Sequence, residues 1–546
     1  MSSVKRDCES FAVRRRLVRR PYAVVAELLI GLLAAIWSIW EARKIAVARA
    51  SLHVDSAMSL GWSAGSASPS NRGGVQDVGL FRGWLNDVSW APGRVWAVGF
   101  DDFHPALHLL VVHALRVAGW SFQTSFLIVN LIGCLLLVAG LMVLNRMDRR
   151  PLVASVVGVV VVVVSPAVLR TASEPRHWML ATAFSMLSAV SLSWVLRSSL
   201  RGDLLGWGRV LLCAAPLVVG LLTESSLVIG FVAWFVVAFV VGLAGSTRSA
   251  MVRNTTRVFF VTVVLWFLAF PQGFTQYLRA SPAFGTGDAP GQSASLDMMR
   301  SKTYLRLLGD LWQIGGDARV TFVLSWGSLL FLFGVQLGVV LVRFGVWSGW
   351  GWFDFRVVTH GFVVGLVGSV WAALYLLLYS FGFLPDHAAG WKYMLPHGVL
   401  LLVGVWDGVQ RCPLRLVGGG LMVAVLVYHS MVLSLDQNGQ AVLVERLADA
   451  DRVVVFGNEL DLLQVMYPLA AGEFVGVPEV YFAGWDEEFE PWMCGGPPEG
   501  EDLVVAARRP PWGLGVDGVF GDSANTQQSS PIGTLERLEV ASIVSC

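Results

Sequence analysis

The sequence predicts an all-α polytopic membrane protein with about eleven transmembrane helices and a small C-terminal α/β domain outside the membrane. Of its 546 residues, 55% are hydrophobic and 14% are charged, whereas a soluble domain carries about 25% charged residues. Many apolar runs reach roughly 18 to 25 residues, the length that crosses about 30 Å of hydrocarbon. The positive charges gather in short loops between these runs, which indicates membrane topology and not nucleic-acid binding.

The N-terminus is predicted to be cytoplasmic. Residues 1–21 are rich in Lys and Arg and precede an apolar run that ends at Trp40, as expected for an uncleaved first span. The run is too long for an ordinary signal peptide and lacks a clear small-residue cleavage site. Glu27 lies inside it, and we expect this residue to pair helices rather than to serve a function.

The first outer loop, residues 43–124, is long and polar, and a loop of this length is usually functional. Within it, residues 104–118 are predicted to form a helix that lies along the membrane surface, with Pro105 at its start. This segment is short for a span and carries three ionisable residues, which are His108, His113 and Arg116. The alternative is a short true span.

Charge counting supports the surface helix. With 104–118 outside the bilayer, every short basic loop falls on the cytoplasmic side, as the positive-inside rule requires. The membrane domain then covers residues 22–435. The spans expected after the first are 125–144, 151–169, 178–196, 210–222, 227–244, 258–270, 320–342, 357–384, 394–409 and 416–435.

Residues 436–546 are predicted to form the extracytoplasmic α/β domain. Two apolar runs, 452–456 and 503–507, have the length and composition of buried strands. A helix is expected at 459–467, with Asn458 as its N-cap and Pro468 at its end. This domain also contains Cys494 and Cys546, whose disulfide would close a loop of about fifty residues. The alternative is two free thiols.

Four groups of polar residues fall on the outer side by the same count. They are Asp55; Asp101 and Asp102 with His104 and His108; Glu174 and Arg176 in the stretch 173–178; and Lys392 and Tyr393 in the stretch 386–393. Cations at a bilayer edge can hold the phosphate of a lipid-anchored donor, and a carboxylate can deprotonate an acceptor. The alternatives are solvated residues at span ends and, for Asp55, the N-cap of a short interfacial helix.

The order of these stretches resembles the GT-C superfamily of glycosyltransferases that use polyprenyl-phosphate sugars. Within it, the resemblance is to the branch with protein mannosyltransferases and the lipid A aminoarabinose transferase. SLHVDSAMSL at 51–60 is similar to a W-x-D-E-A-like stretch of that branch, with Asp55 at the acidic position. HPALHLL at 104–110 is similar to its juxtamembrane H-P-P-L-Y-Y-L-L-like helix.

Two later stretches extend the resemblance. Ser165-Pro166 followed by residues 173–180 is similar to an S-P…S-x-E-x-R-x-Y-x-L pattern, and KYMLP at 392–396 is similar to R-Y-L-L-P. The chain departs from the family pattern at three positions, where Ser56 replaces a Glu, Ala106 replaces a Pro and Lys392 replaces an Arg.

The resemblance implies an inverting glycosyltransferase of a bacterial inner membrane or plasma membrane. It would move a sugar from a polyprenyl phosphate to a lipid, glycan or protein acceptor on the outer face, with Asp55 as general base. The residues expected to bind the donor phosphate are His104, Arg176 and Lys392. Those expected to bind or orient the acceptor are Asp101, Asp102, Glu174 and Tyr393.

Other possibilities stay open at this point. No cofactor is certain, and a divalent metal could be held by the oxygens of Asp55, Asp101, Asp102 and Glu174. A transporter or flippase of a lipid-linked intermediate could use the same cationic pocket without chemistry. The chain could also be an inactive membrane scaffold that presents the C-terminal domain.

Overall fold

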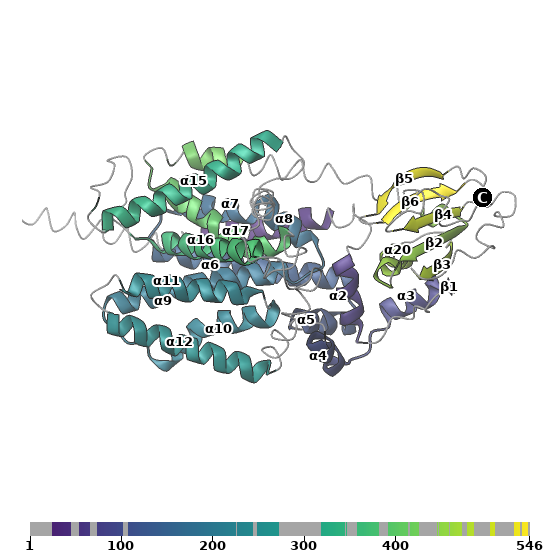
Figure 1. The fold of residues 1–546 in the computed structure, drawn as a ribbon, viewed down its shortest axis with the longest axis horizontal. Coiled ribbons are helices and arrows are strands. Elements are labelled where there is room, and N and C mark those ends of the chain that lie inside the picture. The colour runs from purple at the N-terminus through teal and green to yellow at the C-terminus, as the bar shows by residue number, and fades with distance from the viewer. Residues whose placement is uncertain are drawn as a thin grey trace, which may run out of the picture.

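The computed structural model describes helices, turns and strands along most of the chain (Figure 1). The described residues are 24–44, 54–65, 74–101, 107–224, 226–243, 248–271, 318–343, 346, 358–381, 391–412, 415, 417–424, 445, 447–457, 459–471, 478–484, 503–507, 529–535 and 538–543. Cys494 and Cys546 lie outside them, so their disulfide stays a prediction.

The predicted class of polytopic helical membrane protein is confirmed. Among the described residues, five helices are long and apolar enough to cross a membrane. They are Val24–Lys44, α6 (Phe122–Met147), α9 (Trp178–Leu200), most of α12 (Arg248–Ala269) and α16 (His360–Ser380). α10 (Trp207–Thr223), α11 (Leu227–Leu243), α15 (Ala318–Arg343) and α17 (Trp391–Gln410) pack with them. The total of about eleven spans stays a prediction.

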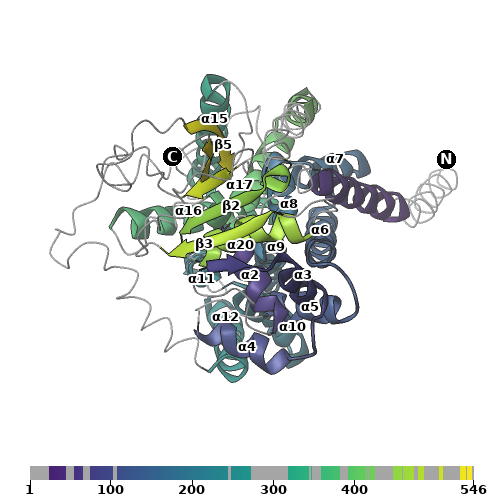
Figure 2. The same ribbon diagram turned by 90° about the vertical axis from the view of Figure 1, so that its right-hand side faces the viewer.

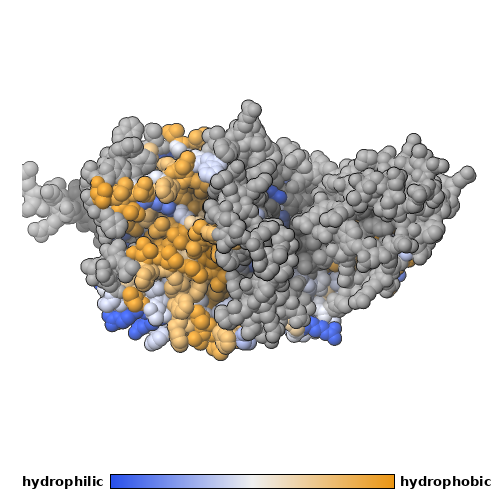
Figure 3. Space-filling view, in the orientation of Figure 1, coloured by the Kyte–Doolittle hydropathy of each residue, from blue (hydrophilic) through white to orange (hydrophobic). Residues whose placement is uncertain are grey.

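The surface of this bundle is apolar, as a lipid-facing surface must be. Figure 3 shows hydrophobic residues gathered over the helical part of the molecule. Large apolar side chains on several helices are highly exposed, among them Phe260 and Leu268 of α12 and Leu330 and Phe333 of α15.

The predicted span 151–169 is not a straight helix. It is divided into α7 (Leu152–Val163) and α8 (Pro166–Ser173), which meet at an angle of 48°. Pro166 has no N–H for the ladder of the preceding helix and suits the first position of a new one. The sequence analysis overlooked this break. Because of this break, the stretch that follows α8 points into the interior of the protein.

Among the described residues, basic residues at several helix ends come together at the end of the bundle opposite the C-terminal sheet (Figure 1). Arg150, after α6, reaches Asp407 near the end of α17 at 2.7 Å. At the same end, Asn254 of α12 donates to the carbonyl of Asp203, which follows α9. The structure therefore groups the basic ends as the charge count predicted, and we expect this end to face the cytoplasm.

The C-terminal domain is built on a six-stranded sheet of order β1-β3-β2-β4-β6-β5. β3 (Glu479–Gly484) and β4 (Leu503–Ala507) lie parallel to β2 (Arg452–Gly457) on either side of it. β6 (Leu538–Ile543) and β5 (Ser529–Leu535) continue the sheet with antiparallel pairing. The predicted strands at 452–456 and 503–507 are thus confirmed.

The helix after β2 is longer than predicted. α20 spans Glu459–Ala471 and contains Pro468, so the expected end at that proline is wrong. Leu469 and Ala470, beyond the proline, are buried. Their carbonyls accept hydrogen bonds from Arg82 at 3.3 and 2.9 Å. Tertiary contacts therefore hold the last turn where local propensity would end it.

A strand from the first outer loop completes the sheet. β1 (Gly74–Gln76) pairs antiparallel with β3, in register Val75 to Tyr481. The next helix, α3 (Val78–Asn86), packs against α20, and Figure 2 shows β2, β3 and α20 beside α2 and α3. One hydrophobic core joins Phe81 of α3 and Phe122 of α6 to Val453 and Leu462 of the C-terminal domain.

The helix predicted within 104–118 is present as α5 (Leu107–Val117), and its position along the membrane surface stays a prediction, but its polar side faces inward. His108, His113 and Arg116 are 1%, 0% and 3% exposed, whereas Val117 is 37% exposed. An ordinary amphipathic surface helix keeps its charges in water. Here the ionisable residues instead make contacts within the protein.

The topology can be tested by thiol labelling in a variant without the six native cysteines. A cysteine at position 94, exposed on α4 (Pro92–Asp101), should react with a membrane-impermeant reagent in intact cells. A cysteine at exposed position 201, after α9, should react only once the cells are permeabilised. The reverse pattern would show that the orientation is inverted.

Candidate functional site

The turn between α8 and α9 is buried, although the sequence allowed it to be a solvated loop. Glu174, Arg176 and His177 are 7%, 5% and 2% exposed. Asn130 of α6 fixes the turn, because its amide nitrogen donates to the carbonyls of Ala172 and Glu174, both at 2.9 Å. The alternative of solvated residues at span ends is therefore wrong for these residues.

A second buried turn, between α10 and α11, supplies a carboxylate that meets this first turn. Glu224 Oε2 lies 2.5 Å from His177 Nε2, and their side chains are 5% and 3% exposed. The other oxygen, Oε1, accepts a hydrogen bond from the backbone nitrogen of Ser226 at 2.9 Å. A buried carboxylate is costly unless it is paired, so this contact holds the two turns together.

Aromatic contacts bring α5 and α17 to the same place. The ring of His108 lies 4.6 Å from that of His177. Trp178 packs edge-on against Tyr393 of α17 at 4.8 Å. Tyr393 lies within electrostatic range of both Glu224 and Arg176. We call the residues His108, Glu174, Arg176, His177, Glu224 and Tyr393 the polar cluster.

The polar cluster combines three kinds of chemistry at the end of the bundle near the C-terminal domain. Arg176 carries a planar guanidinium that matches phosphate oxygens in bidentate fashion. The His177–Glu224 pair can hold or move a proton. Tyr393 adds a phenol that can donate a hydrogen bond. Because these groups are buried, their electrostatic interactions are stronger than they would be in water.

The structure brings together only part of the predicted site. Glu174, Arg176 and Tyr393 share the polar cluster. Asp55 is the second residue of α2 (Val54–Ala64), so it lies inside that helix and is not its N-cap. Asp101 is the last residue of α4 and Lys392 is the second of α17. The side chains of these three, and all of Asp102 and His104, lie outside the described residues.

Glu224 was missed by the sequence analysis. It stands alone between the spans expected at 210–222 and 227–244. The sequence could have identified it, because the charge count places the junction of these two spans on the outer side. A carboxylate at such a junction is a candidate functional residue for the same reason as Asp55.

No group of three or more His, Cys, Asp or Glu side chains in a metal-binding arrangement occurs in the described part of the chain. Of the oxygen ligands that the sequence offered, only Glu174 is described with its side chain. A divalent metal held by Asp55, Asp101 or Asp102 stays a prediction.

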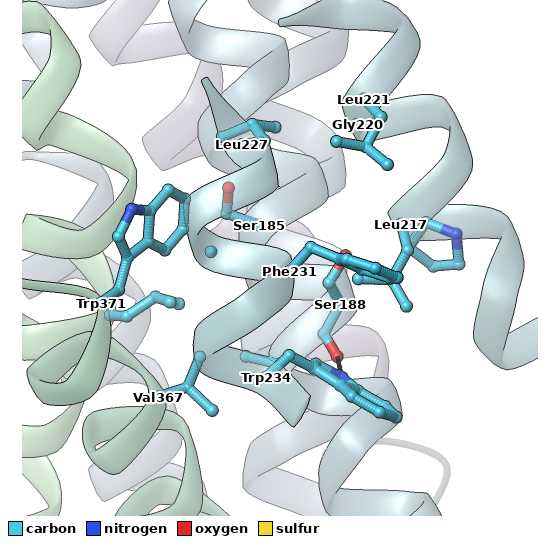
Figure 4. A pocket seen from close by; sticks show the side chains of 14 residues that line it. Ser185, Ser188, Leu217, Gly220, Leu221, Leu227, Phe231, Trp234, Val367 and Trp371 are labelled. Atoms are coloured by element: carbon cyan, nitrogen blue, oxygen red, sulfur yellow. Dashed lines mark hydrogen bonds between the residues drawn. The ribbon is translucent and has the colours of Figure 1, made fainter. Parts of the chain in front are cut away.

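A small apolar cavity of about 20 Å³ lies among α9, α10, α11, α16 and α17 (Figure 4). Trp234 and Trp371 form part of its wall, and the indole nitrogen of Trp234 donates to the carbonyl of Ser188 at 3.0 Å. The hydroxyl of Ser185 donates to the carbonyl of Ala181 in its own helix. Because the cavity is the size of about one water molecule, it is a gap in the packing of the helices and not a ligand pocket.

The opposite end of the bundle is closed by a buried ionic network. Arg150 contacts Asp148 at 3.2 Å and Asp407 at 2.7 Å. Arg411 contacts Asp407 at 2.9 Å. The carboxylate of Asp148 also accepts from the first two backbone nitrogens of α16, at 2.7 and 3.0 Å. An anion at a helix N-terminus is favourable, and the two charges of each sign balance.

Comparisons with known proteins give structural similarities. No family model matches the sequence, and no curated protein matches it. The chain is similar to ArnT from Cupriavidus metallidurans in the apo state, with a TM-score of 0.27 and 13% identity over 80% of this chain and 87% of that chain. For ArnT from the same organism bound to undecaprenyl phosphate, the TM-score is 0.30 and the identity 12%, over 95% and 97%. Neither superposition gives a role to a residue of this chain.

The contact between His177 and Glu224 can be measured by a double-mutant cycle. Each alanine variant should lower the free energy of unfolding by about 3–5 kcal/mol, because it removes one side of a buried pair. The double variant should cost less than the sum, with a coupling of roughly 0.5–3 kcal/mol. Denaturant unfolding in detergent would give these values.

The exposed pair of Glu41 and Lys44, in which Lys44 is 54% exposed, is the control, and Glu41→Ala should cost less than about 1 kcal/mol. Additive losses at His177 and Glu224 would mean that the two side chains do not stabilise each other.

Proposed function

We propose that this protein is a membrane glycosyltransferase that transfers a sugar from a polyprenyl-phosphate donor to an acceptor on the outer face of the membrane. The observation that carries the proposal is the polar cluster, in which Arg176 is buried beside a His–Glu pair and a tyrosine at one end of an apolar bundle. The order of the GT-C-like stretches in the sequence supports the same conclusion.

The proposed reaction is a single displacement with inversion. The acceptor oxygen attacks the anomeric carbon of the donor sugar while the bond from that carbon to the phosphate oxygen breaks. Asp55 takes the acceptor proton. The polyprenyl phosphate leaves with the bonding electrons, and Arg176, with His104 and Lys392, stabilises its negative charge. Asp101, Asp102, Glu174 and Tyr393 orient the acceptor or these cations.

The ionic network at the opposite end favours an enzyme over a transporter or flippase. A carrier must open its site to both sides of the membrane in turn. At this end, Arg150 and Arg411 both bind Asp407, and all three side chains are 7% exposed or less. Opening the bundle there would separate buried charges, at a cost of several kcal/mol. Access from the outer side alone suits a transferase whose sugar stays outside.

The base can be tested with Asp55→Asn, which keeps the size of the side chain and removes its basicity. Transfer from a labelled polyprenyl-phosphate sugar in proteoliposomes should drop by about 10²–10⁴-fold. Asp77→Asn is the matched control, because Asp77 caps α3 in the same loop and asparagine caps equally well. Near-normal transfer by Asp55→Asn would remove Asp55 from the mechanism and direct attention to Asp101 and Asp102.

Donor binding can be tested at Arg176. Arg176→Ala should weaken binding of polyprenyl phosphate more than Arg176→Lys does, because lysine keeps the charge but loses the bidentate geometry. Binding would be followed by fluorescence quenching in detergent, with Arg201→Ala, exposed at the other end, as the control. Wild-type affinity in both Arg176 variants would assign this residue to structure alone.

A further inference from the structure

The C-terminal end of α2 is fixed by two side chains of α5. Arg116 Nη1 donates to the carbonyl of Leu60 at 3.3 Å and to the hydroxyl of Ser63 at 3.1 Å. His113 Nδ1 donates to the carbonyl of Ser63 at 2.9 Å. The last carbonyls of a helix lack partners within the helix and carry partial negative charge, so a cation there is stabilising. α2 is therefore anchored at the end opposite Asp55.

Arg116 binds a second helix end at the same time. Its Nη2 donates to the carbonyl of Leu85 in the last turn of α3, at 3.0 Å. α3 in turn supplies Arg82, which binds the carbonyls at the end of α20. The C-terminal ends of α2, α3 and α20 are thus linked through two arginines. These links connect the outer loop to the C-terminal domain.

The C-terminal domain also approaches Arg116 through Tyr467 of α20. Tyr467 packs edge-on against Phe122 at 5.9 Å, and the guanidinium of Arg116 lies 5.7 Å from the centre of the same ring. Burial lowers the pKa of Arg116 to about 10, against a smaller opposing effect of Tyr467. Burial raises the pKa of Tyr467 to about 12. At neutral pH the guanidinium is therefore charged and the phenol is neutral.

Carbonyl oxygens and an aromatic ring surround this buried cation. Among the described residues, no carboxylate forms a salt bridge with Arg116. The favourable geometry therefore depends on where the helix ends lie. If α2 shifts, the cation loses its acceptors in a place from which water is excluded, which is costly. The position of α2 therefore depends on how the C-terminal domain packs against the outer loop.

We propose that Arg116 is a positioning residue through which the C-terminal domain sets the place of α2, and with it Asp55, for the transfer reaction. The inference rests on the proposed function for its chemical consequence. α2 has 11 residues and is therefore about 16 Å long. A tilt at its anchored end displaces the first turn, where Asp55 lies. A displacement of about 1 Å at a reacting group can cost roughly 10²-fold in rate.

The test measures the position of α2 directly. Nitroxide labels at positions 61 and 143 would report the distance between α2 and α6 by pulsed EPR, in a variant without the native cysteines. A side chain at Gly61 has open space around it, and Val143 is 47% exposed. Arg116→Met should broaden or shift the distance distribution. Arg94→Met, at an exposed arginine of α4 in the same loop, should leave it unchanged.

Kinetics separate positioning from general destabilisation. Arg116→Met should lower kcat by about 10- to 100-fold while the affinity for polyprenyl phosphate stays that of the unsubstituted protein, and Arg116→Lys should restore part of kcat. If Arg116→Met does not fold, Arg116→Lys and Ser63→Ala each remove one set of contacts and should broaden the distribution to a smaller degree.

The proposal would be overturned if every folded variant at Arg116 and Ser63 had an unchanged distribution of distances between α2 and α6. So would an altered distribution with unchanged kcat, provided that Asp55→Asn abolishes transfer. Failure of the proposed function gives a different result. In that case the unsubstituted protein would show no transfer, while the distances in Arg116→Met would still change.

Discussion

Burial of charge at the two ends of an apolar bundle is the constraint on which the arrangement of the helices depends. At one end His177 and Glu224 join two turns. At the other end Asp148, Arg150, Asp407 and Arg411 join four helix ends. Because an unpaired buried charge costs several kcal/mol, each set fixes which turns must be neighbours. The apolar surfaces between them could slide past one another, but the paired ends cannot.

Close helix contacts let these charged ends meet. α16 and α17 approach most tightly at Gly365 and Gly404, where an added Cβ on either residue would lie within 2.7 Å of the other's Cα. On α11, an added Cβ at Gly230 would lie 2.5 Å from the ring of Trp371. Small residues allow helices in a membrane to pack closely, where the hydrophobic effect gives little attraction between them.

The C-terminal domain is more than an appended module. Its sheet takes β1 from the first outer loop, and its core is shared with α2, α3, α5 and the start of α6. Arg82 and Arg116 then bind helix ends across this interface. The segment that carries Asp55 is therefore placed by contacts with residues about 400 positions later in the chain. In the proposed function, the C-terminal domain thus contributes to catalysis without supplying a reacting group.

The sequence by itself determined the class of protein, most helix positions, the grouping of the basic loops and the two central strands. These follow from apolar run length, charge counting and local composition, which act over short stretches. It also pointed to Glu174, Arg176 and Tyr393. Only the tertiary structure decided that α8 bends inward at Pro166, that α20 continues through Pro468, that the polar side of α5 faces the protein and that Glu224 meets His177. Each of these depends on a partner far away in the chain, such as Arg82 for the end of α20, and no local pattern encodes that partner.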